Sequence, residues 1–217
     1  MEIERVMKIK TTDIQVGDRL HVDHYTATCQ EITPKRALFL LDQYLDDTYE
    51  INASDTNVGG YAKSDLRETL RNKEILDVFK GIRDYMAPFE NGDLIRIPFA
   101  GELFGNKLPK WCEPDGHKQW PLMQDVRNRL ASRCGECEWG WLQNKVKTSS
   151  TNFCYVAANG LAGAWLASGV IGVRPAFLIA KWKDKEPALR DFDNHNPVVN
   201  SDRAYVLKNS GIYYGYH

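Results

Sequence analysis

The Asn159-Gly160 dipeptide lies between two apolar segments, and it constrains the fold more than any other feature of this chain. Both residues tolerate a positive φ angle, so the pair is a strong short-range signal for a β-hairpin. Its flanks, residues 151–157 and 161–168, are therefore predicted strands. Residues 139–142 and 172–180 have the same strand-like character. The sequence thus predicts that the C-terminal third is largely β-structure.

A second group of strands is predicted near the N-terminus. Residues 18–24 partly alternate polar and apolar side chains, residues 25–32 are rich in Thr and Tyr, and residues 37–45 begin as a buried apolar run. Thr33-Pro34-Lys35 has the composition of a turn, so these segments predict an N-terminal hairpin. The polar residues 46–60 are predicted to form a solvated loop.

Helices are predicted between these two β-regions. Ser64 is a good N-cap, and Leu66 and Leu70 follow it one turn apart on one face. A second helix is predicted over residues 73–85, and a third is predicted to begin at Pro121, where proline suits the first helical position. The pattern as a whole predicts an α+β fold.

Charge and hydropathy exclude several classes of function. The 217 residues carry 28 basic and 29 acidic side chains, a net charge of −1, which creates no general attraction to nucleic acid or to a membrane surface. The apolar stretches are far shorter than the about 18 residues of a membrane span. Residues 1–5 lack the apolar core of a signal peptide. We therefore expect a protein that stays in the cytoplasm or joins a particle assembled there.

The five cysteines favour a reducing compartment, because their number is odd and no export signal accompanies them. Cys134 and Cys137 form a C-x-x-C pair, and Cys112 and His117 would complete a set of four zinc ligands. The spacing of Cys112 and His117 is not that of a zinc knuckle, and ordinary reduced cysteines are the alternative. We therefore expect no cofactor, and the alternative is a zinc ion bound by these four residues.

The sequence contains no motif of a common catalytic class: G-x-S-x-G, the Walker A loop, G-x-G-x-x-G and H-E-x-x-H are all absent from it. Enzymatic activity is therefore not expected. Strand alternation would turn some rings of the Tyr-rich C-terminal end outward, and tyrosine is frequent in recognition surfaces. The candidate partner-binding residues are Tyr205, Tyr213, Tyr214 and Tyr216, with ordinary strand packing as the alternative.

Six segments of the sequence follow a recurring pattern. They are Tyr61 to Asn72 with its Ser-x-Leu-Arg-x-x-Leu core, Arg127-Asn128-Arg129, Trp139-Gly140-Trp141-Leu142, Phe153-Cys154-Tyr155-Val156, Asn159-Gly160 and Gly172-Val173-Arg174-Pro175-Ala176-Phe177. Together they resemble an uncharacterised domain family that is frequent in phages, prophages and gut bacteria. The resemblance covers roughly residues 10 to 180, and the closing Gly-Val-Arg-Pro-Ala segment is its most specific part.

That family is similar to the C-type-lectin-like fold, in the branch of formylglycine-generating enzymes and retroelement-diversified ligand-binding proteins. The resemblance implies a twisted antiparallel sheet flanked by two or three helices, with residues 1–180 as a single domain. Residues 181–217 would then be a polar connection and a Tyr-rich β-hairpin extension. The paired-cysteine active site of a formylglycine-generating enzyme has no counterpart here.

Arg174 and Pro175 are expected to be structural, as are Asn159 and Gly160 in their turn. An arginine among apolar strand residues needs carboxylate or carbonyl partners, and proline keeps the residue before it extended.

The expected function is that of a non-enzymatic, phage- or prophage-associated binding protein. It would recognise a protein, or a glycan, through lectin-like loops and the aromatic C-terminal hairpin. Its role would be host recognition, particle decoration or host-directed inhibition of a defence system. The alternatives are a zinc-containing module or enzyme, and a structural assembly subunit; a homo-oligomer is compatible with each. One scaffold serves many functions, so the fold does not choose among them.

Overall fold

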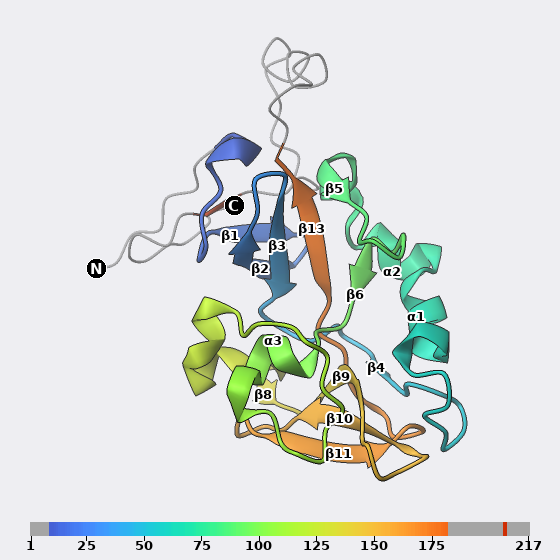
Figure 1. The fold of residues 1–217 in the computed structure, drawn as a ribbon. Coiled ribbons are helices and arrows are strands. Elements are labelled where there is room, and N and C mark those ends of the chain that lie inside the picture. The colour runs from blue at the N-terminus through green and yellow to red at the C-terminus, as the bar shows by residue number, and fades with distance from the viewer. Residues whose placement is uncertain (1–8, 182–205, 208–217) are drawn as a thin grey trace.

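The computed structural model describes residues 9–181 and 206–207, and it has an α+β fold built mainly on antiparallel sheets (Figure 1). The strands of a first, seven-stranded sheet are β1 (Arg19–Val22), β2 (Tyr25–Ile32), β3 (Arg36–Leu41), β5 (Met86–Ala87), β6 (Ile95–Arg96), β13 (Ala176–Ala180) and β14 (Val206–Leu207). They run in the order β14-β1-β2-β3-β13-β5, and β6 also pairs with β13. The predicted N-terminal hairpin is present as β1, β2 and β3.

A second, five-stranded sheet lies below the first in Figure 1. Its strands are β4 (Thr48–Tyr49), β9 (Gly140–Lys145), β10 (Asn152–Val156), β11 (Ala162–Leu166) and β12 (Ile171–Gly172). They follow the order β11-β10-β9-β12-β4, and β12 runs parallel to β9. A small separate hairpin consists of β7 (Ser132–Arg133) and β8 (Glu136–Cys137).

The predicted strand over residues 172–180 is wrong as a single element. The chain leaves the second sheet after β12 and enters the first sheet at β13. Pro175 lies at the crossing and has no N–H to donate to a ladder. The carbonyls of Val173 and Pro175 instead accept hydrogen bonds from Leu45 and Leu41 at 2.9 Å and 3.0 Å. This short connection therefore joins the two sheets.

The helices are short: α1 (Asp65–Leu70), α2 (Lys73–Asp77) and α3 (Ala100–Phe104). The helix predicted over residues 73–85 is α-helical only in α2 and continues, after a break, as a 3₁₀ helix over Lys80–Tyr85. The helix predicted from Pro121 consists of two 3₁₀ segments, Pro121–Gln124 and Val126–Arg129. They are separated by Asp125, whose extended backbone (φ −76°, ψ 120°) breaks an α-helix.

Helix α3 was not predicted, because two of the three side chains that hold its first turn, Asn144 and Asp115, are distant in sequence. The backbone N–H of Phe99 donates to Glu102 Oε2 at 2.8 Å, that of Ala100 to Asn144 Oδ1 at 2.7 Å, and that of Gly101 to Asp115 Oδ2 at 2.8 Å. These bonds satisfy amide groups that a helix leaves without partners at its start.

The buried apolar side chains form two cores, and strand β3 contributes to both. Phe39 and Leu41 belong to the first core, whereas Leu38 and Leu40, which point to the other face, belong to the second. A strand buried on both faces reads as a continuous apolar run, as residues 37–41 do. None of the helices in the described part of the chain is long and apolar enough to span a membrane.

Candidate functional site

Three aromatic side chains gather on one face of the second sheet. The rings of Trp139 and Tyr155 are stacked, with centroids 4.7 Å apart and an interplanar angle of 19°. Trp165 meets Trp139 edge-on, with centroids 5.5 Å apart and an angle of 72°. Offset stacking and edge-to-face contact are the favoured geometries of aromatic pairs. We call Trp139, Tyr155 and Trp165 the aromatic platform.

Glycine makes room for two of these rings. Gly163 lies directly opposite Tyr155 in the β10–β11 ladder, and a Cβ atom at this position would overlap the tyrosine ring. A Cβ atom at Gly169 would overlap the indole of Trp165 in the same way. The absence of side chains at these two positions therefore lets both rings lie against the backbone.

The aromatic platform is accessible but anchored. Trp139 is 37% exposed and Trp165 is 43% exposed, while Tyr155 is half-buried. Trp141 pairs with Tyr155 across the ladder and is buried, and its indole Nε1 donates to the Tyr49 carbonyl at 2.8 Å. The exposed rings therefore continue an aromatic face whose other members belong to the first core.

Three further apolar side chains in the same region of the chain are exposed. Leu166 on β11, Leu161 at the β10–β11 turn and Val170 after β11 are all exposed. Glu138 precedes Trp139, but its carboxylate is paired with Arg133 at 2.7 Å. Burial raises the pKa of the Tyr155 hydroxyl, so this group stays neutral at physiological pH. Such a surface can stack rings and bury apolar area.

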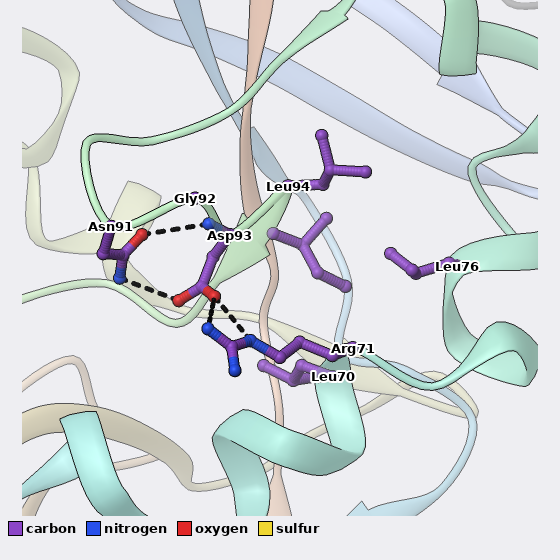
Figure 2. Close-up of a pocket in the computed structure, with 8 residues that line it drawn as sticks. Leu70, Arg71, Leu76, Asn91, Gly92, Asp93 and Leu94 are labelled. Atoms are coloured by element: carbon purple, nitrogen blue, oxygen red, sulfur yellow. Dashed lines mark hydrogen bonds and ion pairs between the residues drawn. The ribbon is translucent and has the colours of Figure 1, made fainter.

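A surface pocket of about 290 Å³ lies beside α1 and β6 (Figure 2). Its lining includes Arg71, Asn91 and Asp93, and these polar groups bind one another. The Asp93 carboxylate accepts from Arg71 Nε at 2.7 Å and from Asn91 Nδ2 at 2.7 Å. The charged groups of this pocket are thus engaged within the protein.

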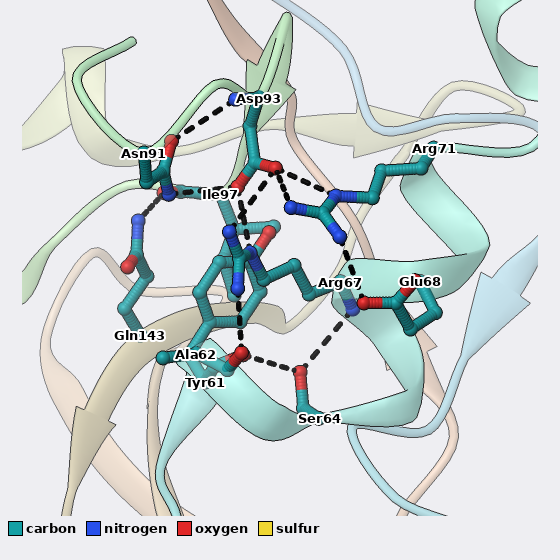
Figure 3. Close-up of polar contacts among 10 residues, drawn as sticks. All are labelled: Tyr61, Ala62, Ser64, Arg67, Glu68, Arg71, Asn91, Asp93, Ile97 and Gln143. Atoms are coloured by element: carbon teal, nitrogen blue, oxygen red, sulfur yellow. Dashed lines mark hydrogen bonds and ion pairs between the residues drawn. The ribbon is translucent and has the colours of Figure 1, made fainter.

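Asp93 is the centre of a polar network that fixes α1 to the loop before β6 (Figure 3). Its side chain is 1% exposed and also accepts a hydrogen bond from Arg67 Nε at 2.7 Å. Arg67 donates in addition to the Ala62 carbonyl at 2.6 Å, and its backbone N–H donates to the N-cap Ser64 at 3.2 Å. The Ser-x-Leu-Arg-x-x-Leu segment therefore has a structural role.

The four proposed zinc ligands do not form a site in the structure. Cys112 is buried, whereas Cys134 and Cys137 are exposed on the β7–β8 hairpin. His117 stacks on Phe99, with ring centroids 4.1 Å apart. Within residues 9–181 and 206–207, no three His, Cys, Asp or Glu side chains are grouped so that they could hold a metal ion.

Arg174 is buried, and within the described residues its guanidinium donates hydrogen bonds to backbone carbonyl groups. Nε donates to the Leu41 carbonyl at 2.5 Å, and one terminal nitrogen donates to the carbonyls of Asn128 and Arg129 at 3.1 Å and 3.3 Å. Burial lowers the pKa of this guanidinium. Arg174, next to Pro175 at the crossing between the sheets, ties three segments together.

Asn159 and Gly160 form the turn between β10 and β11. The Gly160 N–H donates to the Ala157 carbonyl at 2.8 Å, and Gly160 has a φ of 76°. Asn159 keeps a negative φ, and its Oδ1 accepts from the Leu161 N–H at 3.1 Å. The hairpin is therefore present, with one residue rather than two in the left-handed region.

The four candidate tyrosines of the C-terminal end, Tyr205, Tyr213, Tyr214 and Tyr216, lie outside the described residues. The described part of this segment is β14, which pairs antiparallel with β1. The sequence predicted partner recognition by lectin-like loops and by that tail, and it did not predict the cluster of Trp139, Tyr155 and Trp165. The available signal for the platform was the hairpin register, which sets Gly163 opposite Tyr155 once the turn is located.

Comparison of the chain with models of protein families, with curated proteins and with solved structures found no match.

Proposed function

We propose that this chain is a binding protein whose aromatic platform contacts an apolar surface of a partner protein. The observation that carries the proposal is the stacked, exposed cluster of Trp139, Tyr155 and Trp165 on one sheet face. Exposed contiguous apolar surface marks interaction sites in folded proteins. Tryptophan and tyrosine are also the side chains that most often dominate binding energy.

The platform is preorganised, which favours binding. The rings are held by each other, by the flat backbone at Gly163 and Gly169, and by the buried neighbour Trp141. Ordering a side chain at an interface costs about 0.5–1.5 kcal/mol. Rings that are already fixed avoid most of this cost, so a partner would gain their full apolar contact.

The surroundings favour a protein over a glycan as the partner. A sugar is held by polar groups that bind its hydroxyls as well as by stacking. Two exposed side chains of the same region, Leu161 at the β10–β11 turn and Val170 after β11, are apolar and suit an apolar protein surface. The formal net charge of −1 gives no attraction to nucleic acid.

We further propose a C-type-lectin-like scaffold and a phage or prophage setting for this binding protein. The support is the resemblance of residues 10 to 180, together with an α+β architecture built mainly on antiparallel sheets. In that setting the partner would be a host protein or a component of the particle.

The test compares proteins that co-purify with four versions of the chain. These are the wild type, the double variant Trp139→Ala/Trp165→Ala, a truncation that lacks residues 202–217, and the control Val16→Ala. Val16 is 39% exposed and precedes β1 in the first sheet, so it matches Trp139 in exposure but not in place. Melting temperatures are measured for all four.

The proposal predicts a protein retained by the wild type and by Val16→Ala, and lost from the double variant although that variant is folded. Retention by the double variant together with loss from the truncation would place recognition in the C-terminal segment. Identical retention by all four versions would contradict a binding role for the platform.

A further inference from the structure

Two buried cysteine side chains from distant segments meet in the second core. Cys112 Sγ and Cys154 Sγ are 2.7 Å apart, although the residues are separated by 42 positions in the chain. Cys112 is 1% exposed and Cys154 is 0% exposed. Cys29, equally buried, lies elsewhere in the first core, where its Sγ donates to the Glu31 carbonyl at 3.7 Å.

Both cysteines are positioned by regular backbone pairing. Cys154 lies on β10 opposite Ala164 of β11, and its thiol donates to the Lys145 carbonyl of β9 at 3.6 Å. Cys112 is joined to Val146 by an isolated β-bridge just beyond β9. The two sulfur atoms therefore meet above one end of β9. Because the backbone already brings them together, a bond between them needs little rearrangement.

We propose that Cys112 and Cys154 are a redox-responsive pair that forms an intramolecular disulfide. A low-molecular-weight disulfide of the glutathione type is the oxidant. One protein thiolate attacks the oxidant's S–S bond and forms a mixed disulfide, releasing one small thiol. The second protein thiolate then attacks the protein sulfur, releasing the other small thiol. One protein S–S bond forms, one oxidant S–S bond breaks, and two electrons and two protons pass to the oxidant.

The bond would join two segments that share the second core with α3. Cys112 is close in sequence to Asp115, which caps the first turn of α3, and Cys154 is next to Tyr155 of the aromatic platform. Neighbouring residues of a strand point to opposite faces, so the Cys154 thiol lies in the second core while the half-buried Tyr155 ring lies on the other face, against the first core. Oxidation would therefore cross-link β10 on the face opposite the aromatic platform, and the platform would remain accessible.

The reaction is expected to be slow in the folded protein. The hydrogen bond with Cys112 and burial both raise the pKa of the Cys154 thiol, which leaves little reactive thiolate near neutral pH. Cys134 and Cys137 are exposed and would react first. The experiment therefore uses the full chain with Cys134→Ser and Cys137→Ser, so that three cysteines remain.

This variant is incubated with oxidised glutathione at mildly alkaline pH, and samples are taken over time, unfolded and alkylated. The proposal predicts a fall from three alkylatable thiols to one, a mass lower by about 2 Da in samples weighed before alkylation, and a cross-linked peptide pair that contains Cys112 and Cys154. The melting temperature should rise by about 10 °C, and a dithiol reductant should reverse the rise.

Cys29 is the matched control, because it is as buried as the pair and should remain alkylatable throughout. A further variant, Cys154→Ala in the same background, should keep both of its thiols and show no rise in melting temperature. The proposal is overturned if three thiols persist after prolonged oxidation. It is equally overturned if the bond that forms includes Cys29.

Discussion

Asp93 shows how a single buried charge can organise a region of this protein. Its carboxylate is 1% exposed and forms ion pairs with both Arg67 and Arg71. Arg67 lies in α1, and Arg71 is the C-cap residue directly after it. A buried carboxylate is tolerated only when paired and hydrogen-bonded. The same carboxylate that neutralises the arginines thus also fixes α1 against the segment before β6.

Replacing Asp93 by Asn should destabilise the protein by about 2–3 kcal/mol. The change keeps the size of the side chain but leaves two arginines facing a neutral group, and breaking a buried ion pair is costly. Arg67 and Arg71 are 14% and 41% exposed, which moderates the loss through hydration. Urea denaturation measures the free energy of unfolding. The control Asp77→Asn removes an exposed pair with Lys73 and should change it by less than about 0.5 kcal/mol.

Helix α1 begins directly after Ser64, the residue that caps its first turn. The Ser64 hydroxyl accepts the hydrogen bond from the Arg67 N–H, and Leu66 and Leu70 on the next turns are buried. The following helix, α2, starts after Asn72, whose side chain makes no capping bond. Both helices therefore follow a residue of a type that often caps helices, but only Ser64 makes a capping hydrogen bond.

Ser64→Ala is expected to cost about 1 kcal/mol of stability, because an amide of the first turn loses its acceptor. Asn72→Ala should cost distinctly less. Thermal and urea unfolding of the two variants provide the comparison. Equal losses for both would show that the Ser64 hydroxyl contributes nothing specific at this position.

Local sequence signals predicted the cap of α1 and the β10–β11 turn. They did not predict the features that depend on long-range contacts. The cap at Ser64 and the turn at Asn159-Gly160 depend on neighbouring residues, so both were found. The crossing at Pro175 depends on how β12 and β13 pair with strands far away in the chain. Helix α3 depends on Asn144 and Asp115, and no pattern within its own residues announces them.

The candidate site was missed for the same reason. Trp139 reaches Tyr155 and Trp165 only because the second sheet brings three strand regions together. The register of one hairpin could have placed Tyr155 opposite Gly163, but the exposure of the face could not be deduced from it.

The whole molecule carries several tyrosines whose hydroxyls lie in or near its cores. Burial raises the pKa of Tyr25, Tyr44 and Tyr61, and it raises the pKa of the Cys29 thiol to about 12. In the unfolded chain these groups ionise near pH 10 for tyrosine and about pH 8.5 for cysteine. The folded state therefore holds its protons more tightly than the unfolded state does.

The protein should lose stability above about pH 8.5, where the Cys29 thiol ionises in the unfolded chain, and more steeply above about pH 10, where the tyrosines follow. A group whose pKa is raised by folding contributes its stability fully below its unfolded pKa and loses it as pH rises toward the folded value. Each such group removes about 1.4 kcal/mol per pH unit in that window. Urea unfolding between about pH 8 and pH 11, followed together with the ultraviolet absorbance of tyrosinate, measures this. A free energy of unfolding that stays constant across the window would contradict it.

If the aromatic platform is a binding surface, its loss must weaken the affinity for the co-purified partner, and isothermal titration calorimetry measures this affinity. The dissociation constant is measured for the wild type, for Trp165→Ala and for the truncation without residues 202–217. We expect Trp165→Ala to weaken binding by about tenfold or more, and the truncation to leave the affinity close to that of the wild type. An unchanged dissociation constant for a folded Trp165→Ala variant would contradict the claim.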